Sequence, residues 1–427
     1  MTSPFAAPLE RARQDYLDRN TESHRHHRLA SEVMPGGNTR TVLHYPPFPV
    51  TLIAGEGSHL TDADGRVYLD FLGDYTAGLL GHSDRRALDA VIAALHTNMS
   101  VGGHHPAEEQ LARLICERFM VDRVRFTNSG TEANLMAITA ARLVTGKPKI
   151  LVMEHGYHGG VLYYGLEPAP WSAPYPTVMA PFNDLAAVTA AIEQHADELA
   201  AVIVEPMMGG AGCIPAAPGF LSGVVDAARN NGVLSIFDEV MTSRHGAHGF
   251  AELHGAEPDM KTFGKYIGAG FSFGAFGGRA AVMSRFDPNS PDCISHAGTF
   301  NNNIASLSAG VKVLSELYTS DIAVAHTARG EEFRAQVAGV LARSPLPLVA
   351  SGYGTMMTII ARAELPTNGV DAADRDAALQ ELIYLGLLNR GFYTAPRGMV
   401  NLSLPLTDDD LAAFLEALDD ICAELAG

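Results

Sequence analysis

The sequence predicts an α/β protein in which a largely parallel β-sheet is covered by helices on both faces. Beyond about residue 80, short apolar runs alternate with helical patterns, at 149–153, 200–204, 233–237 and 274–283. A strand that is buried on both faces is a continuous apolar run. The helical stretches between such runs supply the long crossovers that parallel strands need.

The composition supports a folded protein with a large core. The chain has 427 residues, of which 47% are hydrophobic and 18% charged. This length is enough for two or three domains of roughly 100–200 residues. A formal charge of -18 repels phosphate groups, so we expect neither nucleic-acid binding nor binding to anionic membranes. No run of about 18 apolar residues predicts a membrane span.

The N-terminal segment and the cysteines indicate a cytoplasmic location. Residues 1–28 are polar and charged, without the apolar centre of a signal peptide. The four cysteines lie far apart without paired spacing, at Cys116, Cys213, Cys293 and Cys422. Such usage suits a reducing compartment better than a disulfide scaffold.

Changes in pattern divide the chain into three predicted parts. Residues 1–75 comprise a helical stretch to about residue 35, then short antiparallel strands within 42–72, punctuated by Gly-containing turns. Residues 76–324 form the large domain and end in a long helix, 304–318. Residues 325–427 form a C-terminal α+β domain.

Ligands of open parallel sheets bind outside the carboxyl ends of the strands. We therefore expect the catalytic and binding residues at these ends. The first candidate is the segment TNSGTEA at 127–133. Ser129 and Glu132 have capping-box spacing, which makes Ser129 a good N-cap. The backbone amides of Gly130 and Thr131 then lie at the positive end of the helix dipole, where phosphate binds. A capping box without a ligand is the alternative.

The second candidate is the segment IFDEV at 236–240, where two carboxylates follow an apolar strand. Asp238 could bind a metal there, or hold a proton on a cationic nitrogen. A solvated strand end, or an N-cap for the next helix, explains the same pattern. The segment alone does not decide among these.

The third candidate is Lys265 in the segment GKYIGAG at 264–270. The chain has four other lysines, of which Lys147 and Lys149 are typical of a loop, Lys312 of a peripheral helix position, and Lys261 of the surface. Lys265 is surrounded by small and apolar residues, where an amine is costly unless it is paired or neutralised. A Schiff base neutralises it, and desolvation lowers the amine pKa. A lysine stem that reaches out to water is the alternative.

Together, a phosphate site, a strand-end aspartate and a buried lysine are the minimal set for pyridoxal 5'-phosphate (PLP). The sequence resembles the class III aminotransferases of the fold-type I PLP enzymes. The resemblance rests on NSGTEA (128–133), EHGYHG (154–159), VEP (204–206), FDEV (237–240), GK (264–265) and GTF (298–300), in family order. It implies a large domain with a mostly parallel seven-stranded sheet between helices. A smaller α+β domain comes from the N- and C-terminal segments.

The resemblance also implies roles for individual residues around the cofactor ring. Lys265 carries the cofactor aldehyde, and Asp238 pairs with the pyridinium nitrogen. Tyr157 stacks on one face of the ring, and Val240 packs against the other. Glu205 matches a family carboxylate near the ring.

The phosphate of the cofactor is expected at the helix start that follows Ser129, held by Gly130 and Thr131. In the family, the residue that matches Thr299 reaches a phosphate across a dimer interface. The resemblance therefore implies a homodimer in which two chains build each active site.

The segments that face the substrate resemble those of aromatic β-amino acid (β-phenylalanine) aminotransferases, which use 2-oxoglutarate as acceptor. They are GGNTRTV (36–42), YPPFP (45–49), DYTAG (74–78), TFNNN (299–303) and TAPRG (394–398). The two substrate arginines of that group match Arg40 and Arg397, both able to form forked bonds to carboxylates. Leu79 and Leu80 depart from the pattern, which carries a larger aromatic residue there. The expected reaction is a ping-pong transamination.

Three other activities fit the same fold. The glutamate-1-semialdehyde aminomutases share the Gly-Gly…Arg element and need no external acceptor. Other ω-amino acid or amine transaminases are a second alternative, and a ligand sensor on a degenerate fold is a third. The intact Lys265 and Asp238 motifs argue against a sensor. We expect no metal site, because adjacent histidines at 24–28 lack ligand spacing.

Overall fold

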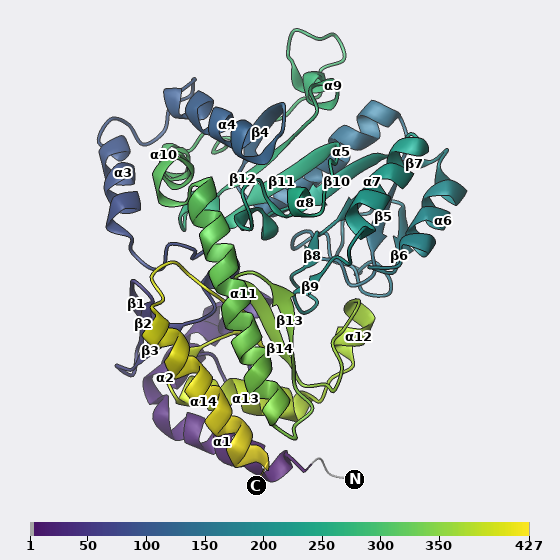
Figure 1. Ribbon diagram of the computed structural model, residues 1–427. Helices are drawn as coiled ribbons and strands as arrows, with labels where there is room; N and C mark the ends of the chain where they lie inside the picture. The colour runs from purple at the N-terminus through teal and green to yellow at the C-terminus, as the bar shows by residue number, and fades with distance from the viewer. Residues whose placement is uncertain (1–3, 427) are drawn as a thin grey trace.

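A seven-stranded sheet lies at the centre of the larger part of the molecule (Figure 1). The computed structural model describes residues 4–426. The strands lie in the order β4 (Arg123–Thr127), β12 (Gly274–Gly278), β11 (Met260–Gly264), β10 (Leu234–Asp238), β7 (Leu199–Val204), β5 (Lys149–Met153) and β6 (Thr177–Ala180). β12 is antiparallel to both of its neighbours, and the remaining pairs are parallel.

Both faces of this sheet are buried, as the continuous apolar runs predict. In β5, Ile150 and Val152 pack in the cluster that includes α5 (Gly130–Thr145). Their neighbours Leu151 and Met153 pack in the cluster that includes α6 (Leu185–His195) and α7 (Phe220–Asn230). Because successive side chains of a strand point to opposite faces, the sheet needs a helical layer on each side.

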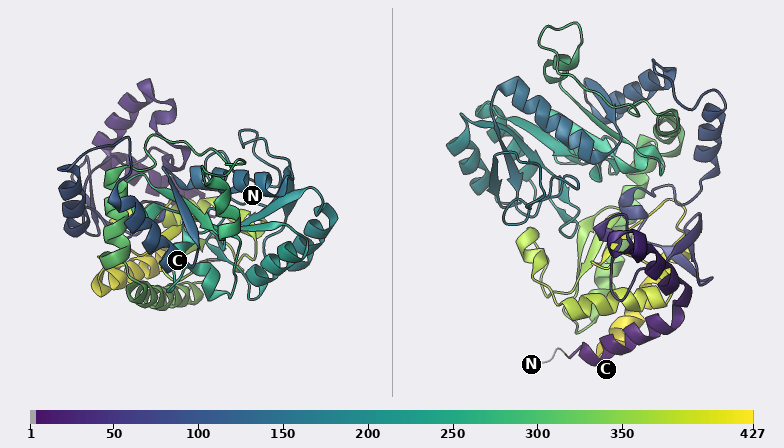
Figure 2. Two further views of the ribbon diagram at one scale, coloured as in Figure 1. Left: turned by 90° about the horizontal axis from the view of Figure 1, so that it is seen from above. Right: turned by 180° about the vertical axis from the view of Figure 1, so that it is seen from behind.

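Figure 2 shows α5 crossing the face of the sheet that is hidden in Figure 1. The other helices of the larger part are α3 (Arg85–Leu95), α4 (Pro106–Phe119), α8 (Phe250–Leu253), α9 (Ala280–Met283) and α10 (Ile304–Lys312). The long helix α11 (Ser320–Arg343) runs from the larger part into the smaller one (Figure 1).

The smaller part combines segments from both ends of the chain. One sheet contains β1 (Leu52–Glu56), β2 (His59–Asp62), β3 (Val67–Asp70) and β15 (Phe392–Tyr393), and a second contains β13 (Val349–Tyr353), β14 (Met356–Ile360) and β16 (Met399–Asn401). A two-stranded ribbon in the larger part pairs β8 (Met207–Met208) with β9 (Ile214–Pro215). The remaining helices are α1 (Ala6–Arg19), α2 (Thr21–Val33), α12 (Gly369–Ala373), α13 (Ala377–Asn389) and α14 (Asp408–Ala426).

Several predicted elements agree with the structure, and one differs. The predicted N-terminal helix is two helices, α1 and α2, and its residues 1–3 lie outside the described part. The predicted helix 304–318 is α10 followed by a π-helical turn, Val313–Leu317. The apolar run 274–283 was expected to be one strand of the largely parallel sheet, and its predicted length is wrong. Its strand ends at Gly278 and is antiparallel, and α9 follows.

The short connection before β12 explains why this strand is antiparallel. Only residues 265–273 separate β11 from β12, with no crossover helix of the kind that a parallel neighbour needs. The boundaries of the three predicted parts, 1–75, 76–324 and 325–427, stay a prediction. Among residues 4–426, no helix has both the length and the apolar character that crossing a membrane requires.

Candidate active site

The sheet register brings the three candidate segments to one edge of the sheet. Asp238 ends β10 and lies beside Thr262 of β11. Gly264 ends β11 and pairs with Gly274, which in turn pairs with Thr127 at the end of β4. The segments that follow these strands therefore meet outside the carboxyl ends, where ligands of such sheets bind.

The carboxylate of Asp238 is buried and held by four donors, of which the hydroxyl of Thr262 is the most distant, at 3.4 Å from Oδ1. Its Oδ2 accepts hydrogen bonds from Nδ2 of Asn134 (2.8 Å) and from Nδ1 of His158 (2.9 Å). Its Oδ1 accepts from the backbone N–H of Val240 (3.1 Å). Only 7% of Asp238 is exposed. Nε2 of His158 is buried and has no partner among the described residues.

Lys265 follows β11 in a left-handed backbone conformation (φ +51). Its Nζ donates to the backbone carbonyl of Tyr75 at 2.8 Å. Burial lowers the pKa of the Lys265 ammonium to about 8. The carboxylates of Asp74 and Asp238 oppose this shift, and the nearby guanidinium groups add to it. The amine is therefore closer to its reactive neutral form than an ordinary lysine.

Lys261, which was expected at the surface, is buried. It is 5% exposed, and its Nζ donates to the carbonyl of Phe119 at 2.9 Å. The expectation was wrong because the preceding Pro258 and Asp259 suggested a loop, whereas β11 begins at Met260.

The start of α5 leaves two backbone amides available. Ser129 caps the helix, with its Oγ accepting from the N–H of Glu132 at 3.2 Å. The carboxylate of Glu132 accepts from the N–H of Asn128 rather than from that of Ser129. The N–H groups of Gly130 and Thr131 have no hydrogen-bond acceptor within residues 4–426. The helix start can therefore bind an anion.

Glycines bring the neighbouring segments close to this helix start. A Cβ on Gly130 would lie 2.7 Å from a methyl group of Val240. A Cβ on Gly159, whose φ is +126, would lie 2.2 Å from Oγ1 of Thr131. The segments around the helix start can approach this closely only because Gly130 and Gly159 have no side chain.

Tyr157 and Glu205 adjoin the same cluster. Oε1 of Glu205 accepts from the backbone N–H of Tyr157 (2.9 Å), and Oε2 accepts from that of Gly209 (3.0 Å). Burial raises the pKa of the Glu205 carboxyl to about 7, an effect that His158 opposes. Burial also raises the pKa of Tyr157, and the charge of Asp238 adds to this effect.

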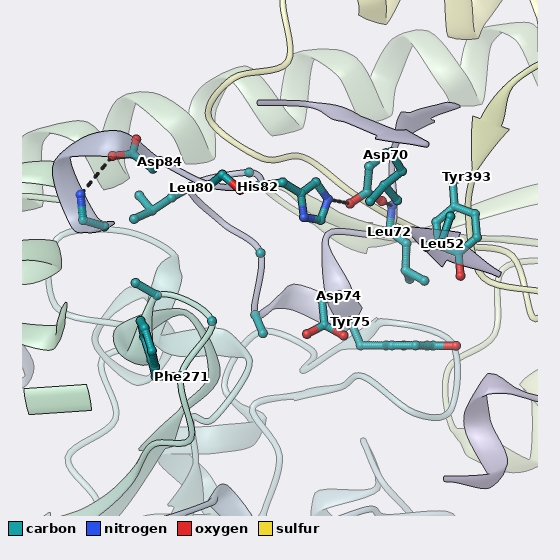
Figure 3. A pocket seen from close by; sticks show the side chains of 18 of the residues that line it. Leu52, Asp70, Leu72, Asp74, Tyr75, Leu80, His82, Asp84, Phe271 and Tyr393 are labelled. Carbon is teal, nitrogen blue, oxygen red and sulfur yellow. Dashed lines mark hydrogen bonds and ion pairs between the residues drawn. The ribbon is translucent and has the colours of Figure 1, made fainter. Parts of the chain in front are cut away.

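Two arginines from opposite ends of the chain lie against the ring of Tyr75. The guanidinium carbon is 5.8 Å from the ring centre for Arg40 and 5.2 Å for Arg397. Nη2 of Arg40 lies 2.9 Å from Oδ1 of Asp74. Asp74, Tyr75 and Leu80 line a cavity of about 370 Å³, and Figure 3 shows the first two side by side.

Thr299 is exposed on the loop before α10 and, within the described residues, makes no hydrogen bond to the other predicted site residues. The same loop touches the helix start through Asn301, whose Oδ1 accepts from Nδ2 of Asn128 at 3.0 Å. One chain thus brings together every predicted site residue except Thr299. Sequence reasoning missed Asn134, and it placed Asp74 and Tyr75 in a substrate-facing segment without a role for either.

Residues 43–422 match the family of class III aminotransferases. The chain is a class III aminotransferase. It is 46% identical to a β-phenylalanine transaminase of Variovorax paradoxus, over 96% of this chain and 94% of the relative. It is 33% identical to a glutamate-1-semialdehyde 2,1-aminomutase of Methanothermobacter thermautotrophicus, over 93% and 98% of the two chains.

Two solved transaminase structures show the same fold. A β-phenylalanine aminotransferase from Variovorax paradoxus superposes with a TM-score of 0.97 at 45% identity, covering 98% of both chains. An ω-transaminase from Sphaerobacter thermophilus superposes with a TM-score of 0.89 at 33% identity, covering 95% of this chain and 98% of that one. The predicted fold-type I architecture is confirmed.

Class III aminotransferases depend on PLP, so this enzyme is PLP-dependent. The chemistry of the site fits that group. It offers free amides at a helix start for a phosphate, a buried carboxylate for a cationic ring nitrogen, and an amine of lowered pKa for an aldehyde. Gly130 and Gly159 keep the approach to the helix start free of side chains.

Proposed function

We propose that the enzyme transfers the amino group of an aromatic β-amino acid, of the β-phenylalanine type, to 2-oxoglutarate by a ping-pong mechanism. The observation that carries the proposal is the position of Arg40 and Arg397. Both guanidinium groups lie against the ring of Tyr75, whose carbonyl accepts from Lys265. The site thus offers two carboxylate receptors beside the reactive amine.

The proposed cofactor contacts follow the geometry of the sheet edge. Lys265 would bind the aldehyde of PLP, and Asp238 would pair with its ring nitrogen. Tyr157 and Val240 would pack on the two faces of the ring, and Glu205 holds the backbone of Tyr157 in place.

At the other end of the cofactor, the N–H groups of Gly130 and Thr131 bind the phosphate, on a helix start fixed by Ser129. Thr299 of a second chain completes the phosphate site in a homodimer. The exposure of Thr299 in the single chain is consistent with such a role.

PLP, when bound, stores the electrons that a substrate carbon releases as it loses a proton. Nζ of Lys265 accepts that proton and later returns it, a task that suits an amine of pKa about 8 at neutral pH. Asp238 keeps its negative charge directed at the ring nitrogen, because His158 and Asn134 hold both the position and the orientation of its carboxylate.

The two arginines divide the recognition of carboxylates. A β-amino acid carries its carboxylate one carbon farther from the amine than an α-amino acid does. Arg40 reaches in from the N-terminal segment and binds this carboxylate through its planar fork. Arg397 binds the α-carboxylate of 2-oxoglutarate.

Arg40→Ala tests the substrate class. Loss of a charge-assisted hydrogen bond of this kind costs about 1.5–3 kcal/mol, which is roughly tenfold to a hundredfold in binding. The Michaelis constant (KM) should therefore rise strongly for β-phenylalanine but little for 1-phenylethylamine, which has no carboxylate. Arg40→Lys should restore binding only in part, because lysine lacks the fork.

Arg86→Ala is the matched control. Arg86 is exposed at the start of α3 and pairs with Asp84, not with Asp74 as Arg40 does. Equal losses for both donors in Arg40→Ala would contradict the assignment of Arg40. Assays with and without 2-oxoglutarate complete the test. Turnover of glutamate-1-semialdehyde that needs no keto acid would instead support an aminomutase.

A further inference from the structure

The two arginines that we propose for substrate binding differ in their partners. Arg40 is paired with Asp74 through the 2.9 Å contact, and about half of each side chain is exposed (52% and 53%). Arg397 has no carboxylate partner within residues 4–426. Its Nη2 contacts Sδ of Met399 at 3.3 Å, and its Nε is buried without a partner. Within the described residues, Arg40 thus already binds a carboxylate of the chain itself, whereas Arg397 binds none.

Asp74 is held in place by an unusual backbone turn. Four successive residues have positive φ, namely Gly73 (+55), Asp74 (+44), Tyr75 (+53) and Thr76 (+80). Residues with side chains rarely adopt this conformation, so the surrounding structure must maintain it. The carboxylate of Asp70 does so in part, because its Oδ1 accepts from the N–H of Gly73 at 2.9 Å.

The same turn contacts the other reactive groups of the site. The carbonyl of Tyr75 accepts from Lys265, and its ring lies against Arg397. Its hydroxyl donates to the carbonyl of Val42, two residues after Arg40. The turn therefore fixes Asp74 relative to the amine and to both arginines, at the wall of the cavity in Figure 3.

We propose that Asp74 determines substrate specificity by occupying Arg40 until a substrate carboxylate takes its place. This proposal rests on the proposed function of Arg40. The carboxylate of a β-amino acid must displace that of Asp74 from Arg40, so the free energy of the exposed Arg40–Asp74 pair is subtracted from what the substrate gains. An amine without a carboxylate leaves the Arg40–Asp74 pair intact and meets no unpaired charge. Asp74 thereby weakens the preference for carboxylated donors.

Asp74→Asn tests the proposal, since asparagine keeps the shape of the side chain and adopts positive φ readily. The probes are 3-phenylpropanoate and its neutral analogue 3-phenylpropanamide, which lack an amine and cannot be transaminated. Calorimetry on the PLP-loaded enzyme should show a two- to fivefold lower Kd for 3-phenylpropanoate in the variant, as expected for removal of an exposed ion pair. The Kd of the amide should not change.

Steady-state kinetics provide a second readout. In Asp74→Asn, KM for β-phenylalanine should fall relative to KM for 1-phenylethylamine. A damaged site would weaken the binding of both probes, so tighter binding of 3-phenylpropanoate alone cannot result from damage. Asp74→Gly should act in the same direction, because glycine tolerates the turn and also lacks the carboxylate.

Asp84→Asn is the matched control. Asp84 lines the same cavity but pairs with Arg86, and asparagine preserves its N-cap of α3. Its Kd values should equal those of the wild type. Unchanged or weaker binding of 3-phenylpropanoate in both Asp74 variants would overturn the proposal, provided that Arg40→Ala weakens that binding. If Arg40→Ala leaves the binding unchanged, the proposed function of Arg40 fails, and the role of Asp74 fails with it.

Discussion

The carboxylate of Asp238 depends on two neighbours that lie far away in the sequence. The strand-end pattern identified Asp238, and the motif EHGYHG contained His158 without a role for it. Asn134 was missed, although its setting carried a signal. Asparagine is unfavourable inside a helix, so one within the Ala-rich run of α5 indicates a hydrogen-bonding task. Its Nδ2 bonds to Asp238, and its Oδ1 accepts from Thr262.

Asp238→Asn should lower kcat by about 10²–10³, the usual effect of removing one preorganised electrostatic contact from an active site. The neutral amide no longer favours a protonated ring nitrogen, whereas the fold should be retained. The measurement is turnover per bound cofactor, with absorbance reporting the cofactor content. Asp226→Asn, at an exposed position of α7, is the control. Near-normal turnover in Asp238→Asn would show that the ring nitrogen lies elsewhere.

Lys265→Met should stabilise the cofactor-free protein at pH 7. The folded pKa of about 8 lies below the ordinary value of 10.5, so the unfolded chain binds more protons between these values. The resulting penalty is complete below pH 8 and disappears as the pH rises through 10.5. We expect a gain of about 1–3 kcal/mol at pH 7 and almost none near pH 10.5. Urea denaturation at both pH values measures this gain in the free energy of unfolding. Equal gains at the two pH values would indicate that the variant is stabilised by packing and not by loss of the buried charge.

At the scale of elements, the start of α5 shows how a local signal becomes a binding site. The capping residue Ser129 was predicted from spacing alone, and the structure confirms it. The approach of the 154–160 segment to Thr131 was not predictable, since it depends on the missing side chain of Gly159. Local sequence thus defines where the helix begins, and tertiary packing defines what lies over that end.

Gly159→Ala should weaken the binding of PLP. The added methyl group would overlap with Oγ1 of Thr131 and would also strain a residue with φ of +126. We expect displacement of Thr131 at the proposed phosphate site to cost about tenfold to a hundredfold in affinity. Equilibrium dialysis against the cofactor measures the change.

Gly160→Ala is the control for this substitution, because a Cβ at Gly160 has no neighbour within 4 Å and the backbone there is ordinary. Equal retention of PLP by the Gly159 and Gly160 variants would contradict the proposed role of Thr131.

At the scale of the whole molecule, the site draws on both ends of the chain and on its middle. Arg40 precedes β1, Lys265 follows β11, and Arg397 precedes β16. Strand β15, from the C-terminal region, pairs in parallel with β3 from the N-terminal region. This pairing joins the two ends of the chain in the smaller part of the molecule (Figure 1). Both arginines lie against the ring of Tyr75, whose carbonyl accepts from Lys265 after β11.

Hybrid dimers test the proposal that two chains share each site. Lys265→Ala removes the amine, and Thr299→Asp places a negative charge beside the proposed phosphate of the partner site. Each variant alone should be nearly inactive. A hybrid of the two, purified through two different tags, contains one intact site and should regain about half of the wild-type activity. A hybrid as inactive as its parents would contradict the shared site.

The sequence by itself determined the fold class and the family, and it indicated most of the residues of the proposed site. Periodic burial and helix-capping spacing are local properties, and the motifs around Lys265 and Asp238 are short and ordered. Such features can be predicted from short stretches of sequence, because the hydrogen bonds and burial that cause them involve residues close together in the chain.

Only the tertiary structure decided which distant residues meet. It made β12 antiparallel to its neighbours, buried Lys261, and brought Asp74 to Arg40 and Tyr75 to Lys265. Asp74 and Tyr75 carry no local sign of these contacts, because their partners lie far away in the sequence: Arg40 for Asp74, and Lys265 for Tyr75. Contacts of this kind depend on strand order and on the closure of long loops, which no short stretch of sequence specifies.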